Sequence, residues 1–210
     1  MYQMKILDLL KESNNYSTRW IKYFEVYDQI FEKFRDKKIT FVEVGVLNGG
    51  SLEMWKKYFH PESRIIGIDL NPECKKFEKN GIEIFIGDQS DEKFWDNFFK
   101  QVGNIDILLD DGGHLSHQQI ITTVKSIKNI NDGGLLLVED VHASYMESFN
   151  NIRKRTFIDF SKKLIDDVNK KNPLIKENLF KFSLNDYVHS IHFFESIVVI
   201  NVDRKKTYEN

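Results

Sequence analysis

The sequence predicts an α/β protein with a doubly wound, mostly parallel, seven-stranded sheet that ends in an antiparallel hairpin. Two observations support this fold class. Between residues 39 and 140, five short apolar runs alternate with segments of helical periodicity, which is the pattern of βαβ units. Two further apolar runs near the end of the chain follow each other too closely for a helical crossover, so they predict a hairpin.

The expected strands are continuous apolar runs, as in sheets that are buried on both faces. Strands are expected at 39–46, 64–70, 82–88, 105–112 and 134–140, with hairpin strands at 190–194 and 197–202 around Glu195-Ser196. Helices are expected at 51–59, after Pro72, at 91–101, at 116–129, and in a last helix that stops before Asn172-Pro173.

An aromatic helix is expected ahead of the first strand. Residues 19–35 carry Trp, Tyr, Phe and Ile at helical spacing, with Ser17 or Thr18 as the N-cap. The spacing favours core contact, and the alternative is a helix over a ligand site in which Tyr23 touches substrate. We therefore expect one domain, 1–210, made of an N-terminal helical segment, 1–37, and a Rossmann-like core, 38–210.

Composition limits the partners and the compartment. The chain has 30 basic and 32 acidic side chains, which argues against a broad basic surface and a nucleic-acid partner. Cys74 is the single cysteine, so no intrachain disulfide is possible and a cytoplasmic location is expected. The first residues do not read as a signal peptide, and no apolar run is long enough to span a membrane.

A glycine-rich turn follows the first expected strand, at the end of the sheet where open α/β folds bind ligands. Its sequence is Glu43-Val-Gly-Val-Leu-Asn-Gly-Gly-Ser51, and glycine lets a backbone approach a ligand closely. The spacing departs from dinucleotide patterns and from Glu/Asp-x-Gly-x-Gly-x-Gly, since Leu47 replaces the middle glycine. The cofactor-binding candidates in this turn are Glu43, Gly45, Asn48, Gly49 and Ser51.

Further cofactor candidates end the next strands. Asp69 is placed to accept hydrogen bonds from two ribose hydroxyls, and its alternative role is an N-cap ahead of Pro72. Asp88, with Gln89 and Ser90, is placed to hold an adenine amino group, and its alternative role is to cap the 91–101 helix. Asp110, at the end of the fourth strand, completes the set.

Two acidic motifs end neighbouring strands. Asp-Asp-Gly-Gly-His spans 110–114, and Glu-Asp-Val-His spans 139–142. Carboxylates crowded in this way raise each other's pKa unless a cation relieves them, and Mg²⁺ or Mn²⁺ prefers such oxygen ligands. The alternative is that each run only solvates a strand end or caps the next helix. His114 and His142 are the histidines that accompany the acids, whereas His117, His189, His192 and His60 read as surface, structural or loop residues.

The run from Tyr23 to Tyr145, with these motifs, resembles the metal-dependent sugar O-methyltransferases, which are class I enzymes that use S-adenosylmethionine. That group includes mycinamicin-type macrolide enzymes and enzymes that modify bacterial surface-polysaccharide sugars. The resemblance implies Asp111, Glu139 and Asp140 as ligands of Mg²⁺ or Mn²⁺, and His114 as the general base. Asp111 is thereby also placed in the catalytic set, and His142 and Tyr145 become substrate candidates beside Tyr23.

The implied reaction is methyl transfer to a sugar hydroxyl, with a capsular or other surface sugar, free or nucleotide-activated, as the acceptor. The alternatives are a catechol-like or natural-product acceptor, a nucleotide-dependent oxidoreductase and a non-catalytic binding module. Arg153-Lys154-Arg155 is either a solvated helix face or a partner for nucleotide phosphates. The chain lacks the long N-terminal extension of the macrolide group, which leaves the substrate and a homo-oligomer open.

Overall fold

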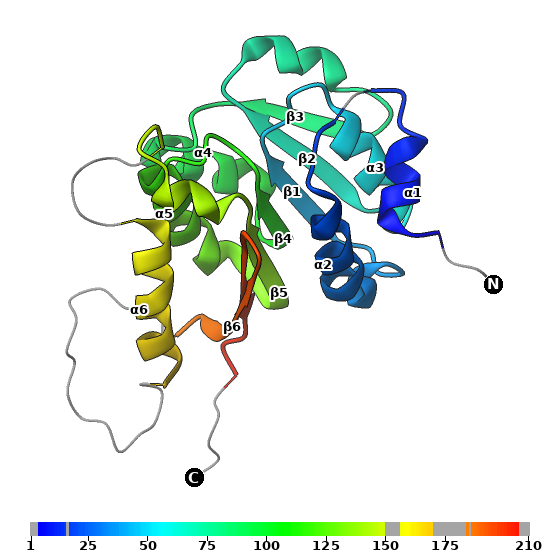
Figure 1. The fold of residues 1–210 in the computed structure, drawn as a ribbon. Helices are drawn as coiled ribbons and strands as arrows, with labels where there is room; N and C mark the ends of the chain where they lie inside the picture. Colours follow the sequence, from blue (N-terminus) through cyan, green and yellow to red (C-terminus); the bar gives the residue numbers. More distant parts are fainter. Residues whose placement is uncertain (1–3, 16, 150–155, 170–183, 185, 206–210) are drawn as a thin grey trace. The chain divides into compact units, whose positions relative to one another are not determined.

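The structure, a computed structural model, describes residues 4–15, 17–149, 156–169, 184 and 186–205. Its seven strands form a mixed, mostly parallel sheet with a C-terminal antiparallel pair, which confirms the expected fold class. The chain divides into two compact units, Met1–Asp88 and Gln89–Asn210, whose elements are labelled in Figure 1. The single domain over 1–210 stays a prediction.

The first unit holds three parallel strands in the order β3-β2-β1. Its elements are α1 (Ile6–Lys11), α2 (Ile21–Phe31), η1 (Glu32–Phe34), β1 (Thr40–Val44), α3 (Gly50–Tyr58), β2 (Arg64–Asp69), η2 (Pro72–Phe77) and β3 (Ile82–Ile86). Helix α3 packs on β2 and β3, and α1 packs on α3. The apolar runs of β1 and β2 are almost completely buried, as expected for strands covered on both faces.

Aromatic rings from three elements make the core of the first unit. Tyr27 and Phe31 on α2, Phe41 on β1 and Trp55 on α3 are fully buried, with ring centroids 5.1 to 6.1 Å apart. Most of these contacts are edge-to-face, which suits the quadrupoles of the rings. The prediction that the aromatic stripe is core is confirmed for these α2 residues.

A buried ion pair joins the segment before α2 to the end of β1. Arg19 Nη2 contacts Glu43 Oε1, and both side chains are almost inaccessible to solvent. Arg19 also donates from Nη1 to the Tyr27 hydroxyl at 3.1 Å. Glu43 accepts from Ser51 Oγ at 2.8 Å and from Trp55 Nε1 at 3.4 Å. The carboxylate of Glu43 therefore binds three elements of the unit together.

The glycine-rich turn after β1 is held by the carboxylate that ends β2. Asp69 Oδ2 accepts from the backbone N–H of Val46 at 2.8 Å and of Leu47 at 3.2 Å. Leu47 has a left-handed backbone, with φ of 49°, and its side chain is 59% exposed. A residue with a Cβ is strained in this conformation, and glycine is not.

The second unit contains the rest of the sheet, in the order β4-β5-β7-β6. Its elements are α4 (Glu92–Val102), β4 (Ile105–Asp110), α5 (Ser116–Ser126), η3 (Ile127–Asn129), β5 (Ile130–Val138), η4 (Val141–Tyr145), α6 (Phe157–Asn169), β6 (Val188–Phe194) and β7 (Ile197–Val202). Strands β4 and β5 are parallel with Asp110 opposite Val138, so both acidic motifs begin at the same edge. Helix α6, yellow in Figure 1, packs on α5 and on β6.

Several expected boundaries are wrong, each for a local reason. Helix α2 begins at Ile21 rather than after Ser17 or Thr18, and Trp20 stands at its N-cap without a side-chain hydrogen bond. The helix after Pro72 is a 3-10 helix capped by Asn71, whose side chain accepts from the N–H of Glu73. Strand β4 stops at Asp110 rather than 112, because that side chain accepts from the N–H of Gly112 and starts a turn.

Strand β5 begins at Ile130, four residues before the expected start at 134. Its first part pairs with β4 through a register shift between Ile105 and Ile107, and Gly133 has a φ of 82° there. Such an irregularity interrupts the apolar run that marks a strand in the sequence. Among the helices that the structure describes, none is long and apolar enough to cross a membrane.

Replacing Arg19 by Met should lower the free energy of unfolding by about 3–5 kcal/mol, because Glu43 would be left buried without its countercharge. Urea denaturation of the full chain measures this. The control is Lys38→Met, which breaks the exposed pair with Glu62 and should cost about 1 kcal/mol or less. Equal losses in the two variants would contradict a stabilising role for the buried pair.

Replacing Leu47 by Gly should raise the free energy of unfolding by about 0.5–1 kcal/mol, since relief of the left-handed strain exceeds the entropy cost of glycine. The matched control is Leu70→Gly, because Leu70 is equally exposed but its φ is not positive. That control should lose stability. Thermal and urea unfolding of both variants decide the sign, and a loss of similar size in each would contradict the strain at Leu47.

Candidate active site

The cofactor-binding candidates of the first unit lie along the carboxyl ends of its three strands. Gly45 donates its N–H to the Ile68 carbonyl at 2.8 Å, which ties the start of the turn to β2. Asn48 is exposed, whereas Gly49, with φ of 73°, and Ser51 are buried at the start of α3. The turn thus ends in a helix N-terminus, where backbone N–H groups favour an anionic or polar ligand.

The alternative capping roles of Asp69 and Asp88 are wrong. Asp69 accepts from the N–H of Asn71 at 2.8 Å, and Asn71 itself is the N-cap of η2. Helix α4 is capped by Asp91, which accepts from the N–H of Lys93 at 2.8 Å. Asp69 and Asp88 are half-buried at the ends of β2 and β3. Their ribose and adenine roles stay predictions.

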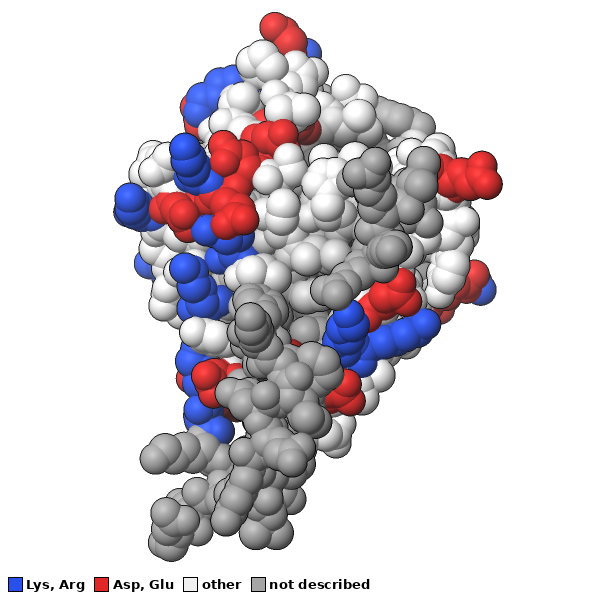
Figure 2. All heavy atoms as spheres, turned by 90° about the vertical axis from the view of Figure 1, so that its left-hand side faces the viewer, with Lys and Arg blue, Asp and Glu red and all other residues white. Residues whose placement is uncertain are grey.

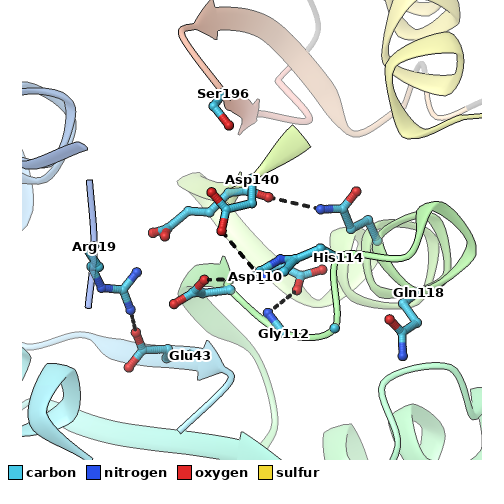
Figure 3. A network of polar contacts seen from close by, with 12 residues as sticks. Arg19, Glu43, Asp110, Gly112, His114, Gln118, Asp140 and Ser196 are labelled. Carbon is cyan, nitrogen blue, oxygen red and sulfur yellow. Dashed lines mark hydrogen bonds and ion pairs between the residues drawn. The ribbon is translucent and has the colours of Figure 1, made fainter. Parts of the chain in front are cut away.

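The second unit brings three side chains of the acidic motifs together. Asp111, His114 and Asp140 each offer a ligand atom, and these atoms all lie within 4.8 Å of one another. His114 Nε2 is 3.5 Å from Asp140 Oδ2 and 4.0 Å from Asp111 Oδ1, as the close view in Figure 3 illustrates for His114 and Asp140. All three are about one-fifth exposed, so solvent and a small ligand reach them.

The backbone is left-handed at two of these three residues. His114 has φ of 57° and Asp140 has φ of 52°, a conformation that costs a residue with a Cβ roughly 1–2 kcal/mol. Such strain persists only where the surroundings enforce it, and it is concentrated at functional sites. Both residues lie in the turns that follow strands, His114 in the turn after β4 and Asp140 in the turn after β5.

Asp110 is the most deeply buried acid of the cluster. Its carboxylate accepts from Gln89 Nε2 at 3.0 Å and from the N–H of Gly112 at 3.2 Å. Burial raises the pKa of Asp110 to about 6, while these hydrogen bonds and His114 act in the opposite direction. The Asp110 carboxylate therefore stabilises the start of the turn that carries Asp111 and His114, and its cofactor role stays a prediction.

Glu139, an expected metal ligand, is buried and lies outside the group formed by Asp111, His114 and Asp140. Its backbone carbonyl accepts from Gln119 Nε2 at 3.0 Å. His114, expected as the base, instead stands among the possible ligands in the described residues. The roles of both residues stay predictions.

Sequence reasoning missed two residues that contact predicted site residues. Arg19 pairs with Glu43, and Ser196 Oγ lies 2.5 Å from His142 Nδ1. Ser196 is in the hairpin turn and has φ of 64°, and its position is visible in Figure 3. Neither residue belongs to a motif. The only sequence signal for Arg19 was its position before a helix, and the only signal for Ser196 was its position between two strands.

The substrate candidates have different environments. His142 is 3.9 Å from Asp140 Oδ1, and Tyr145 on η4 is strongly exposed. Tyr23 is buried and its ring packs between Trp20 and Tyr27. Arg153-Lys154-Arg155 lies outside the described residues.

The donor set fits a hard divalent cation. Two carboxylates and an imidazole converge at a partly open point, and Mg²⁺ and Mn²⁺ favour such oxygen-rich sites with positions left for water or substrate. Nδ1 of His114 is buried and has no hydrogen-bond partner among the described residues. The contacts of the ring in the described residues are therefore made through Nε2, which faces Asp140 and Asp111.

No protein-family model matches the chain. It is 34% identical over 154 residues to the 8-demethyl-8-alpha-L-rhamnosyl tetracenomycin-C 2'-O-methyltransferase of Streptomyces olivaceus, covering 69% of this chain and 40% of that protein. It is 32% identical over 130 residues to the mycinamicin VI 2''-O-methyltransferase of Micromonospora griseorubida, covering 59% of this chain and 32% of that protein. The chain thus spans less than half the length of these two relatives.

Solved structures share the fold. The MycE methyltransferase of the mycinamycin biosynthetic pathway, in complex with Mg and SAH, superposes with a TM-score of 0.86 at 23% identity, over 97% of this chain and 55% of that one. An rRNA methylase from Streptococcus thermophilus superposes with a TM-score of 0.55 at 9% identity, over 89% of this chain and 99% of that one. This chain has the class I methyltransferase fold and is related in sequence to the sugar O-methyltransferases that act on glycosylated natural products.

Proposed function

We propose that the chain transfers the methyl group of S-adenosylmethionine to a sugar hydroxyl of a glycosylated small molecule, with a divalent cation at Asp111 and Asp140. The observation that carries the proposal is the convergence of Asp111, His114 and Asp140 in a chain related to enzymes named for such reactions. A module that only binds a ligand has no need of a general base such as His114. The named relatives act on a rhamnosyl group and on mycinamicin VI, which favours a glycoside over a capsular sugar.

The cofactor side of the proposal rests on the first unit. The turn from Glu43 to Ser51 offers backbone N–H groups and an approach without side chains at Gly45 and Gly49. Asp69 orients that turn through Val46 and Leu47, and its remaining lone pairs are directed to ribose hydroxyls. Asp88 is assigned to the adenine amino group. S-adenosylmethionine supplies the methyl group as its carbon–sulfur bond breaks.

The chemical side rests on the second unit. Asp111 and Asp140, with Glu139, would hold the cation, and its positive charge would make the hydroxyl of a bound sugar more acidic. His114 takes the hydroxyl proton on Nε2, the ring nitrogen that faces Asp140 at 3.5 Å. The carboxylates of Asp140 and Asp111 stabilise the imidazolium that results.

His142 and Tyr145 are assigned to the acceptor. His142 is partly exposed and fixed by Ser196, so its ring presents one nitrogen in a defined direction. Tyr145 presents an exposed aromatic face on the segment that follows Asp140. Tyr23 is buried in this structure, and its contact with the acceptor stays a prediction.

The remaining assignments concern partners and location. Figure 2 shows a face on which basic and acidic side chains lie beside one another in small groups, which supports a small-molecule rather than a nucleic-acid partner. Pairs such as Lys125 with Asp96, 2.7 Å apart, reduce the free positive charge. A cytoplasmic location is supported by the single buried cysteine, Cys74.

Incubation of the full chain with S-adenosylmethionine, Mg²⁺ and a rhamnosylated aromatic polyketide should give the methylated glycoside, detected by mass spectrometry. Chelator should abolish the product, and Mg²⁺ or Mn²⁺ should restore it, because the acceptor hydroxyl is activated at the acidic cluster. Parallel reactions contain a catechol or a nucleotide-activated rhamnose. If only the catechol is methylated, the acceptor is a catechol-like molecule and not a glycoside. Full activity in the presence of chelator would show that the reaction needs no divalent cation.

Replacing His114 by Ala should lower kcat by about 10²–10⁴ if the imidazole is the base. If His114 is the base and not a ligand, the Mg²⁺ dissociation constant of the variant should change by less than about tenfold. If His114 is a ligand, its loss should weaken Mg²⁺ binding by more than roughly 10–100-fold, which is the effect of losing a residue that only supports a ligand. Calorimetry and steady-state kinetics separate the two roles. His117→Ala, on the first turn of α5, is the matched control and should change neither quantity.

A further inference from the structure

Gln89 is buried at the start of the second unit, and its side-chain amide lies among the residues of the 110–114 turn. Nε2 donates to Asp110 Oδ1 at 3.0 Å and to Thr122 Oγ1 at 3.1 Å. Oε1 accepts from the N–H of Gly113 at 2.8 Å. The donors and the acceptor of the amide are therefore all engaged within the unit.

The backbone of Gln89 is also held in place. Its backbone carbonyl accepts from Trp95 Nε1 at 2.9 Å, and Trp95 is a fully buried residue of α4. The side chain thus extends from a fixed point to the turn. Only 5% of Gln89 is exposed, which leaves little surface for a cofactor.

The turn needs such support because its shape is strained. His114 has a left-handed backbone, and the preceding residue, Gly113, receives the hydrogen bond from Gln89. Gln118, in the first turn of α5, also contacts this turn, because its Oε1 accepts from the N–H of Leu115 at 3.2 Å. Gln89 and Gln118 therefore accept from the backbone N–H groups just before and just after His114.

We infer that Gln89 is a positioning residue: it holds the Asp110–His114 turn in the shape in which Asp111 and His114 meet Asp140. This assignment replaces the adenine contact expected from the sequence, and it rests on the proposed metal site. Without the amide, the Gly113 N–H and the Asp110 carboxylate lose a shared partner. The strained φ of His114 then relaxes, and Asp111 and His114 separate from Asp140.

The test compares Gln89→Met with Thr122→Val in the full chain. Calorimetric titrations with Mg²⁺ and, separately, with S-adenosylhomocysteine measure the two affinities, and thermal unfolding confirms that each variant is folded. Gln89→Met should weaken Mg²⁺ binding about 10–100-fold, as loss of a residue that orients ligands does. The dissociation constant for S-adenosylhomocysteine should stay within about threefold of that of the unsubstituted chain. The roughly 10–100-fold loss is expected only for Mg²⁺, because Gln89 supports the turn that carries the metal ligand Asp111.

Thr122→Val removes one partner of the same amide and leaves the Asp110 and Gly113 bonds, so it should leave both affinities unchanged. If the methionine variant does not fold, Gln89→Asn, which keeps the amide but shortens its reach, gives the same measurement. Weakened S-adenosylhomocysteine binding with intact Mg²⁺ binding would overturn the inference in favour of a cofactor contact. Equal change in both affinities, or none, would also overturn it.

Absence of Mg²⁺ binding in the unsubstituted chain would reject the metal site itself, and with it this role of Gln89. That result is distinct from a failure confined to the variants, because it appears before any residue is changed.

Discussion

The main constraint on the second unit is the crowding of carboxylates at one edge of its sheet. Asp110 and Val138 are register partners on parallel neighbours, so Asp110, Asp111, Glu139 and Asp140 follow two adjacent strand ends. Like charges at this spacing oppose folding unless each finds a donor or a cation. Gln89 and the N–H of Gly112 serve Asp110, and the His114 imidazole faces Asp111 and Asp140. The arrangement of the site follows from this need for compensation.

The crowding also explains where the backbone is strained. Of the five non-glycine residues with positive φ in the described chain, three carry groups of the site: His114, Asp140 and Ser196. Each lies in the turn that follows a strand: His114 after β4, Asp140 after β5 and Ser196 between β6 and β7. The other two, Leu47 and Asn80, lie in turns of the first unit. Strain is thus concentrated where polar groups converge rather than spread over the loops.

The sequence predicted what depends on local pattern. Apolar runs marked all seven strands, and β1, β2, β4 and β7 are almost completely buried, as such runs predict. It could not predict contacts between distant residues: Arg19 and Glu43 are 24 residues apart, and His142 and Ser196 are 54 apart. The alternative capping roles of Asp69 and Asp88 were wrong for a local reason: Asn71 and Asp91, two or three residues further on, are the N-caps. Gln89 was noticed for its place after a strand, but its partners come from β4, the turn and α5.

The fold alone does not decide the acceptor, because a sheet of this kind also serves enzymes that act on RNA. In this chain the acidic cluster with its histidine lies in the second unit, while the glycine-rich turn and its carboxylates belong to the first. Under the proposed function, cofactor recognition and acceptor activation would therefore draw on different sets of residues. Different contacts stabilise these sets: a buried ion pair in one unit and a strained, hydrogen-bonded turn in the other. Substitutions at the acidic cluster can change the acceptor chemistry while the contacts that shape the cofactor turn stay intact. If the two sets of residues are independent in this way, enzymes of one fold can keep the same methyl donor while they act on different acceptors.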